Sequence, residues 1–232
     1  MKKILTVLLM LTLVLSLVAC GGEKFDPSAK SEGVMTYADY DAAELDTEVV
    51  IEGYVQGMQA YSAEYGNTSL YLQDPDGAYF VYRLACTAED AAKFVKGAKV
   101  KITGYKSAWS GEVEIVDATF EIMEGTWVAE PMDATALLGT DDLIKHQNKL
   151  AKFNDLTIEK IEYKNGEPGD DIYVTVSKDG NSYSFCVESS LVGPETDVYK
   201  AFADLVAGDV VDIEGFLYWY EGVNTHITAV SK

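Results

Sequence analysis

Apolar and polar residues alternate along ten short stretches of this chain, the pattern of β-strands that bury one face. The clearest stretch alternates Val49, Ile51, Gly53 and Val55 with their neighbours, and the glycine within it indicates a bend or bulge. The ten stretches fall into two sets of five. We expect strands at residues 49–56, 68–73, 78–84, 99–106 and 112–123, and again at 156–163, 172–177, 182–188, 210–218 and 225–230.

Four other stretches carry helix signals. Residues 35–46 open with Thr36 as a candidate N-cap and Asp39 three residues later, and residues 87–95 open with Thr87 and end before a glycine. Helices are also expected at residues 141–153 and 197–206. Each set of strands therefore has a leading helix and a second, short helix between its third and fourth strands.

Glycines repeat in register across the two sets. The first set spaces them seven residues apart and the second repeats that spacing 111 residues later, at Gly97, Gly104 and Gly111 and at Gly208, Gly215 and Gly222. A period near 100 residues is too long for a solenoid unit, which runs roughly 20–50 residues, and matches a small domain. We expect a first domain at residues 34–125, a linker at 126–140 and a second domain at 141–232.

Five strands with a helix between the third and fourth, and a glycine bend in the first, resemble the OB-fold. That resemblance implies a mainly β protein built from two tandem five-stranded Greek-key barrels. Another small barrel or a β-sandwich is the alternative, although five strands fit a sandwich poorly. The chain also resembles small exported OB-type lipoproteins of bacteria, a group without a settled activity.

The N-terminus has the form of a targeting segment. Lys2 and Lys3 precede an apolar run that ends in Leu17-Val18-Ala19-Cys20. This tetrad resembles the lipobox of bacterial lipoproteins, which implies cleavage after residue 19, a lipid on the Cys20 sulfur, and attachment to the extracytoplasmic side of the cell membrane. Residues 20–33 would then be a flexible tether. An ordinary secretory signal or an uncleaved membrane anchor are the alternatives.

The chain is strongly acidic, with a net charge of −20 that becomes −22 once Lys2 and Lys3 are removed. Neither half contains a block of lysine or arginine. Because a phosphate backbone would be repelled, nucleic acid is an unexpected partner, although the fold analogy alone would suggest it.

Signals for catalysis are few. No catalytic residue, cofactor or metal ligand set is assigned: His146 and His226 are isolated, and no Cys/His spacing suggests zinc. Asp170-Asp171 in a glycine-rich loop could hold calcium, but we interpret this pair as part of a turn. Cys86 and Cys186 could form a bridge between the domains, but we interpret them as small hydrophobic residues in or near strands.

Aromatic residues occupy the loops where OB barrels bind ligands. The loops joining strands one to two and four to five hold the candidate ligand-binding residues Tyr61, Tyr65, Trp109, Tyr218, Trp219 and Tyr220. Such rings can stack on sugar rings or on bases, or they can cap a barrel end or bury an inter-domain contact. The favoured function is a non-catalytic, membrane-anchored binding or adapter protein for a glycan, peptide or protein. The alternatives are an OB-fold nucleic-acid-binding protein, or an envelope enzyme or accessory subunit that uses acidic residues.

We predict that Cys20→Ala abolishes lipid attachment, because the lipobox resemblance places the lipid on that sulfur. Metabolic labelling with a fatty-acid probe should mark the wild-type protein and leave the variant unmarked. Equal labelling of the two proteins would contradict the prediction.

Overall fold

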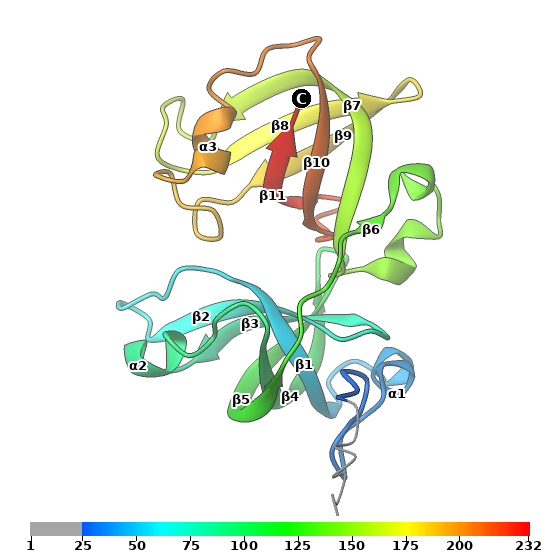
Figure 1. Ribbon diagram of the computed structural model, residues 1–232, viewed down its shortest axis with the longest axis vertical. Coiled ribbons are helices and arrows are strands. Elements are labelled where there is room, and N and C mark those ends of the chain that lie inside the picture. Colours follow the sequence, from blue (N-terminus) through cyan, green and yellow to red (C-terminus); the bar gives the residue numbers. More distant parts are fainter. Residues whose placement is uncertain (1–24) are drawn as a thin grey trace, which may run out of the picture.

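The computed structural model describes residues 25–232, so the predicted signal peptide and Cys20 lie outside the described part of the chain. Two β-structured bodies are stacked along the long axis of the molecule (Figure 1). The first contains α1 (Tyr37–Ala42), β1 (Glu48–Met58), β2 (Asn67–Gln73), β3 (Ala78–Ala85), α2 (Ala88–Ala91), β4 (Ala98–Trp109) and β5 (Glu112–Thr126). The second contains β6 (Met132–Asp133), the 3₁₀ turns η1 (Thr135–Leu137) and η2 (Leu143–His146), β7 (Leu150–Tyr163), β8 (Ile172–Lys178), β9 (Asn181–Val187), α3 (Asp197–Ala201), β10 (Val210–Phe216) and β11 (His226–Ser231).

The first body is a closed barrel. Its strands follow the hydrogen-bonded order β1-β2-β3-β5-β4, and β4 pairs back onto β1. Neighbours are antiparallel except β3 and β5, which are parallel. The apolar positions of the alternating pattern, including Ile51, Leu72 and Ile102, point inward and are fully buried. This strand order, with α2 between β3 and β4, is that of an OB-fold barrel.

The second body repeats the same topology. Its strands run β7-β8-β9-β11-β10, and β10 closes onto β7. The parallel contact is again between the third and fifth strands, β9 and β11. A helix, α3, again lies between the third and fourth strands. The prediction of two tandem OB-type barrels is therefore confirmed.

Two pairs of the in-register glycines have the same structural role in both barrels. Gly97 and Gly208 follow the helices with φ of +88° and +95°, a region that favours glycine. Gly104 and Gly215 lie in the fourth strands, where a Cβ would meet the carbonyl oxygen of Val116 at 2.8 Å or that of His226 at 2.4 Å. The repeat thus preserves one helix end and one close backbone approach.

The leading helix is present in the first barrel and absent from the second. The helix α1 begins at a capping box formed by Thr36 and Asp39. In the second half, the predicted helix at 141–153 is wrong: the turn η2 ends by Asn148, which has a φ of +68°, and β7 already begins at Leu150. Pairing with β10 buries Phe153 in the second core, and this outweighs the local helix signals.

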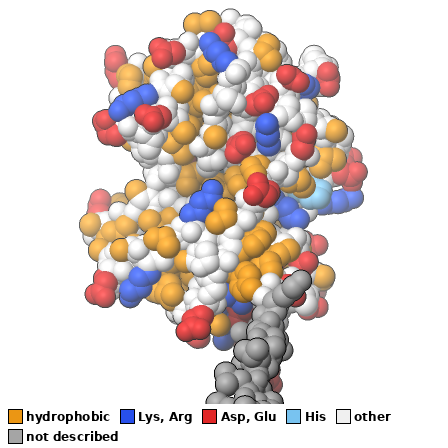
Figure 2. All heavy atoms as spheres, viewed as in Figure 1, with side chains coloured by type: hydrophobic (Ala, Val, Ile, Leu, Met, Phe, Trp, Pro, Cys, Tyr) orange, Lys and Arg blue, Asp and Glu red, His pale blue; other side chains and the backbone are white. Residues whose placement is uncertain are grey.

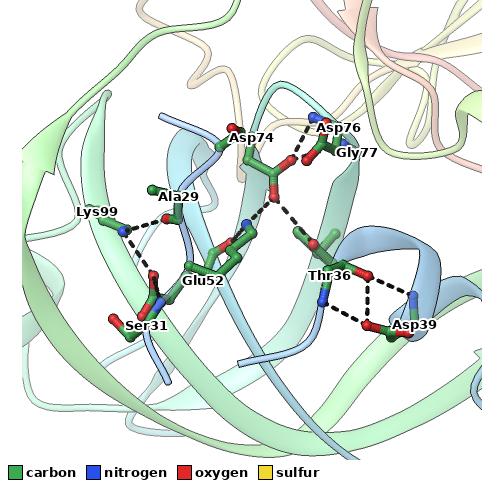
Figure 3. A network of polar contacts seen from close by, with 12 residues as sticks. Ala29, Ser31, Thr36, Asp39, Glu52, Asp74, Asp76, Gly77 and Lys99 are labelled. Atoms are coloured by element: carbon green, nitrogen blue, oxygen red, sulfur yellow. Dashed lines mark hydrogen bonds and ion pairs between the residues drawn. The ribbon is translucent and has the colours of Figure 1, made fainter. Parts of the chain in front are cut away.

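The predicted linker and tether are both more ordered than their composition indicates. In the linker, Met132 and Asp133 form β6, which pairs in parallel with β7. In the tether, the Lys30 ammonium donates to the Asp74 carboxylate of the first barrel. The Ala29 carbonyl accepts from Lys99 of β4, which also pairs with Glu52 of β1 at 2.8 Å (Figure 3). Because both carboxylates are fully buried, these lysines neutralise charges that would otherwise be costly to bury. Residues 25–33 therefore pack against the first barrel.

The two barrels meet through the outer face of β2 and β3. Tyr71 and Phe80 on that face pack against Leu150 and Phe216 of the second barrel. The rings of Tyr71 and Phe216 are stacked, with centroids 4.2 Å apart and an angle of 5° between planes. An OB-fold commonly binds its ligand on this face. In the first barrel, the second barrel covers it.

Hydrogen bonds surround this apolar contact. The Leu150 N–H donates to Gln73 Oε1 at 2.9 Å, and the Ala60 N–H donates to the Ser190 carbonyl at 2.5 Å. On the other side, Gln147 Oε1 accepts from the Val113 N–H at 3.1 Å. Backbone groups of each barrel thus have hydrogen-bond partners in the other, which restricts the orientation of the two barrels.

We predict that Phe216→Ala lowers the free energy of unfolding by about 3–5 kcal/mol, because it empties the centre of the contact between the barrels. Urea unfolding of the soluble protein measures this. Val210→Ala on the same strand is the control: Val210 is 52% exposed, so its truncation should change stability by at most about 0.5 kcal/mol. Equal effects of the two variants would contradict the observed packing.

Candidate functional site

A cleft opens where the two barrels meet, and we call it the inter-barrel cleft. It has a volume of about 380 Å³ and is lined from both barrels, with Tyr65, Tyr82 and Arg83 on the first and Glu188, Tyr218 and His226 on the second. A smaller hollow of about 180 Å³ shares Tyr82 and Tyr218 with it and adds Trp109 and Glu114. The combined volume of the cleft and the hollow falls within the range of roughly 300–1,000 Å³ that is typical of small-ligand sites.

Aromatic rings form much of the wall. Tyr218 stacks on His226 at 4.1 Å and meets Phe80 edge-on at 5.5 Å. Trp109, at the end of β4, lies 5.2 Å from Tyr220 in the β10–β11 loop. Trp109 is 54% exposed and Tyr65 is 67% exposed. Large exposed rings at the rim of a cleft are suited to stacking on a flat ligand face.

Arg83 occupies the first-barrel wall in an uncommon backbone conformation. Its φ is +49°, at a point where the register between β2 and β3 shifts. Its N–H donates to Ser69 Oγ at 3.2 Å. The guanidinium lies 5.0 Å from the Tyr82 ring centre and 5.9 Å from that of Tyr65. A bulge of this kind redirects a side chain, and here it directs a cation to two rings of the cleft.

The second-barrel wall carries an ionised carboxylate. Glu188 accepts two hydrogen bonds from Gln59 Nε2, at 2.9 and 2.7 Å, and lies 3.2 Å from His226 Nδ1. Burial opposes ionisation, but the His226 and Gln59 contacts outweigh it and lower the pKa of Glu188. His226 Nδ1 is also 2.5 Å from the hydroxyl of Tyr71, so this network joins the cleft to the contact between the barrels.

Beside the hollow, burial raises the pKa of two glutamates of β5. Glu112 is fully buried, and its Oε2 accepts the Trp219 N–H at 2.8 Å while its Oε1 has no partner among residues 25–232. Burial raises the pKa of Glu112 to about 8. Burial also raises the pKa of Glu114, which lines the hollow.

The structure brings together most of the aromatics that the sequence singled out. Tyr65, Trp109 and Tyr218 line the cleft or its hollow, and Tyr220 contacts Trp109. Trp219 instead packs against the second core and the barrel contact, with its indole 3.4 Å from the position of a Cβ on Gly111. Tyr61 is half-buried on the same loop as Tyr65 and lies outside the described lining.

Sequence reasoning missed Tyr82, Arg83 and Glu188. All three lie on or beside strands, where alternation indicates only which face they occupy. One signal was available, because Arg83 is the only arginine among 232 residues. Its placement by a bulge could not be foreseen.

Several other expectations concern residues away from the cleft. Cys86 and Cys186 are free thiols in the described structure. Asp170 and Asp171 interact with Lys164, and no group of three His, Cys, Asp or Glu within residues 25–232 could hold a metal ion. In the same range, no helix has the length and apolar character needed to cross a membrane.

No protein family matches this chain, and no curated protein matches it. Among solved structures, the p202 HIN1 domain in complex with 12-mer dsDNA has a TM-score of 0.37 at 13% identity, covering 80% of this chain and 90% of that one. The Ifi202 HINa domain in complex with 20 bp dsDNA has a TM-score of 0.36 at 12% identity, covering 74% and 84%. A replication protein A heterotrimer bound to ssDNA has a TM-score of 0.33 at 13% identity, covering 75% and 45%.

We predict that folding stability falls as pH rises from about 4.5 to about 8. Folding raises the pKa of Glu112 from 4.5 to about 8. Between these two pH values the folded protein keeps a proton on Glu112 that the unfolded chain has released, so folding becomes less favourable as the pH rises. The loss should be roughly a few kcal/mol. Glu112→Gln should flatten the dependence, because an amide keeps an acceptor for the Trp219 N–H and does not ionise.

The measurement is urea unfolding of wild type and variant at several pH values between 5 and about 8.5. Glu124→Gln, at the exposed end of β5, is the control and should retain the wild-type slope. An unchanged slope in Glu112→Gln would show that Glu112 does not control this pH dependence.

Proposed function

We propose that this chain is a non-catalytic binding protein, anchored to the extracytoplasmic side of a bacterial membrane through Cys20, that holds a ligand in the inter-barrel cleft. The observation that carries the proposal is the convergence of aromatic rings from both repeats. Tyr65 of the first barrel and the half-buried Tyr218 of the second line the cleft, and Trp109 of the hollow contacts Tyr220 of the second barrel. The lipobox resemblance supports the anchor.

A glycan suits this cleft better than a peptide or a protein. Hydroxyl and amide side chains, among them Ser62, Asn67 and Ser190, lie in the same lining as the rings. Rings that stack on sugar faces, combined with neutral groups that bond to sugar hydroxyls, are what a saccharide requires. Peptides are often bound by addition to a free strand edge. Both barrels are closed, so their pairing leaves little edge for that mode.

Nucleic acid remains an unfavourable partner for this chain. Acidic side chains are scattered over both barrels on the face seen in Figure 2. Among the described residues, those that line the aromatic hollow beside Trp109 include Glu114 and no lysine or arginine. Phosphate backbones bind through clusters of cations, and a net charge of −20 opposes their approach.

One observation favours a second function, the hydrolysis of a glycan by a carboxylate pair. The pKa of Glu114 is raised and that of Glu188 is lowered, and both residues border the aromatic site. Opposite shifts are typical of a general acid and its partner. New reducing ends released from an oligosaccharide by wild type and not by Glu114→Gln would support this function. We rank hydrolysis second because the Glu188 carboxylate already interacts with Gln59 and His226.

We predict that Trp109→Ala weakens glycan binding by about 1–3 kcal/mol, the range found for ring–base stacking, with little change in stability. Binding is measured on an array of neutral and acidic oligosaccharides with the soluble form, residues 21–232, and thermal melting is measured in parallel. Trp219→Ala should behave in the opposite way, losing stability because Trp219 packs against the second core.

Tyr105→Ala is the matched control. Tyr105 is also an exposed ring on β4, at 43%, but it lies outside the lining of the cleft. Its removal should leave binding unchanged. If Trp109→Ala binds as wild type does and melts much earlier, the ring is structural and the assignment of the site is wrong.

A further inference from the structure

We propose that Arg83 binds a carboxylate on the ligand. The cleft would then select an oligosaccharide of uronic acid units over its neutral counterpart. This inference rests on the proposed function and adds the chemical class of the ligand. Its starting point is the juxtaposition of one guanidinium with Tyr65 and Tyr82 at the cleft wall.

Arg83 is the only arginine in a chain that has 38 aspartates and glutamates. Within residues 25–232, ten lysines form ion pairs, but Arg83 forms none. Its side chain instead faces two rings, and the hydrogen bond of its residue is made by the backbone N–H. The planar donor edge of the guanidinium therefore remains available for a ligand in the described structure.

A guanidinium held against rings is suited to a carboxylate. Its donors form a rigid fork that matches two carboxylate oxygens, and stacking on tyrosine restricts the plane of the fork without using the donors. Lysine would offer a point charge without that geometry. The left-handed backbone at Arg83, with φ of +49°, is uncommon for a residue other than glycine and fixes where the side chain leaves the strand.

The other charged groups of the cleft do not cancel this cation. Glu188 already interacts with Gln59 and His226, and Glu114 lies in the adjoining hollow, outside the lining that contains Arg83. No lysine lines the cleft or its hollow within the described residues. The net charge of the whole chain opposes the approach of any polyanion. Salt screens charges beyond roughly 8 Å at physiological ionic strength, so a short oligomer whose carboxylate contacts Arg83 directly is affected less than a long phosphate backbone.

A single cation also limits the kind of anion. Polyphosphates need several cations along their length, and this cleft provides one. A carboxylated sugar needs one fork for its carboxylate, a ring for its face, and hydroxyl or amide partners for its remaining groups. Arg83, Tyr82 and Asn67 supply these together in one lining.

The test compares an oligogalacturonide with the same oligomer after its carboxyl groups have been reduced to primary alcohols. Wild-type residues 21–232 should bind the acid at least tenfold more tightly than the reduced oligomer, and the preference should shrink as salt is raised. Arg83→Gln should remove the preference while retaining the weaker binding of the reduced oligomer. Arg83→Lys should retain only part of the preference for the acidic oligomer.

Lys96→Gln removes one positive charge from the same barrel outside the cleft and should leave the preference intact. Equal binding of the two oligomers, or an unchanged preference in Arg83→Gln, would overturn the role of Arg83. If the reduced oligomer still binds in a Trp109-dependent way, the proposed glycan site survives that result. If neither oligomer binds and an acetylated tetraglutamate peptide binds through Arg83 instead, the ligand class is overturned.

Discussion

The stack of Tyr71 on Phe216 is the contact on which the arrangement of this protein depends. Each ring lies on the outside of its own barrel and would be exposed if the barrels separated, yet each is at most 2% exposed in the structure. Burial of two large rings favours association, and the surrounding hydrogen bonds restrict it to one orientation. The duplicated fold is thus a single unit with a fixed relation between its halves.

That contact also determines where a ligand can bind. The face of β2 and β3 on which an OB barrel commonly binds its ligand is covered in the first barrel by Phe216 and Leu150. The edge of the same face, at Tyr82 and Arg83, remains open and is completed by Tyr218 from the second barrel. The candidate site therefore exists only in the paired barrels.

Stability and recognition are linked through the groups that the contact buries. Glu112 lies behind the aromatic hollow without a cation, and its hydrogen bond from the Trp219 backbone holds the β10–β11 loop in place. That loop carries Tyr218, which lines the cleft, and Tyr220, which contacts Trp109. Ionisation of Glu112 would strengthen that hydrogen bond but bury a charge without a cation, and the cost of this burial destabilises the folded pair of barrels.

Much of the fold followed from patterns visible in the sequence, because alternation, turn glycines and helix caps are local. Gly97 and Gly208 have the positive φ that their repeated position indicates. The helix expected before the second barrel was wrong because the segment that contains Phe153 pairs with β10, a partner more than fifty residues away.

For the candidate site, the sequence indicated which loops its residues occupy, but not the direction in which each side chain points. Trp109 and Tyr218 were singled out because they lie in loops where OB barrels commonly bind ligands, and the structure places them at the hollow and the cleft. Trp219, their neighbour in sequence, turns toward the core, and Arg83 reaches the cleft only through a bulge whose register no local pattern reveals. A lone arginine in an acidic chain was the one signal that could have directed attention to it.

A double-mutant cycle on Tyr71 and Phe216 tests the central claim most directly. Tyr71→Leu, Phe216→Leu and the double variant are unfolded in urea alongside wild type. The account predicts one cooperative transition for wild type and a coupling energy of about 0.5–1.5 kcal/mol between the two rings. Additive effects, together with two separate transitions in wild type, would contradict it.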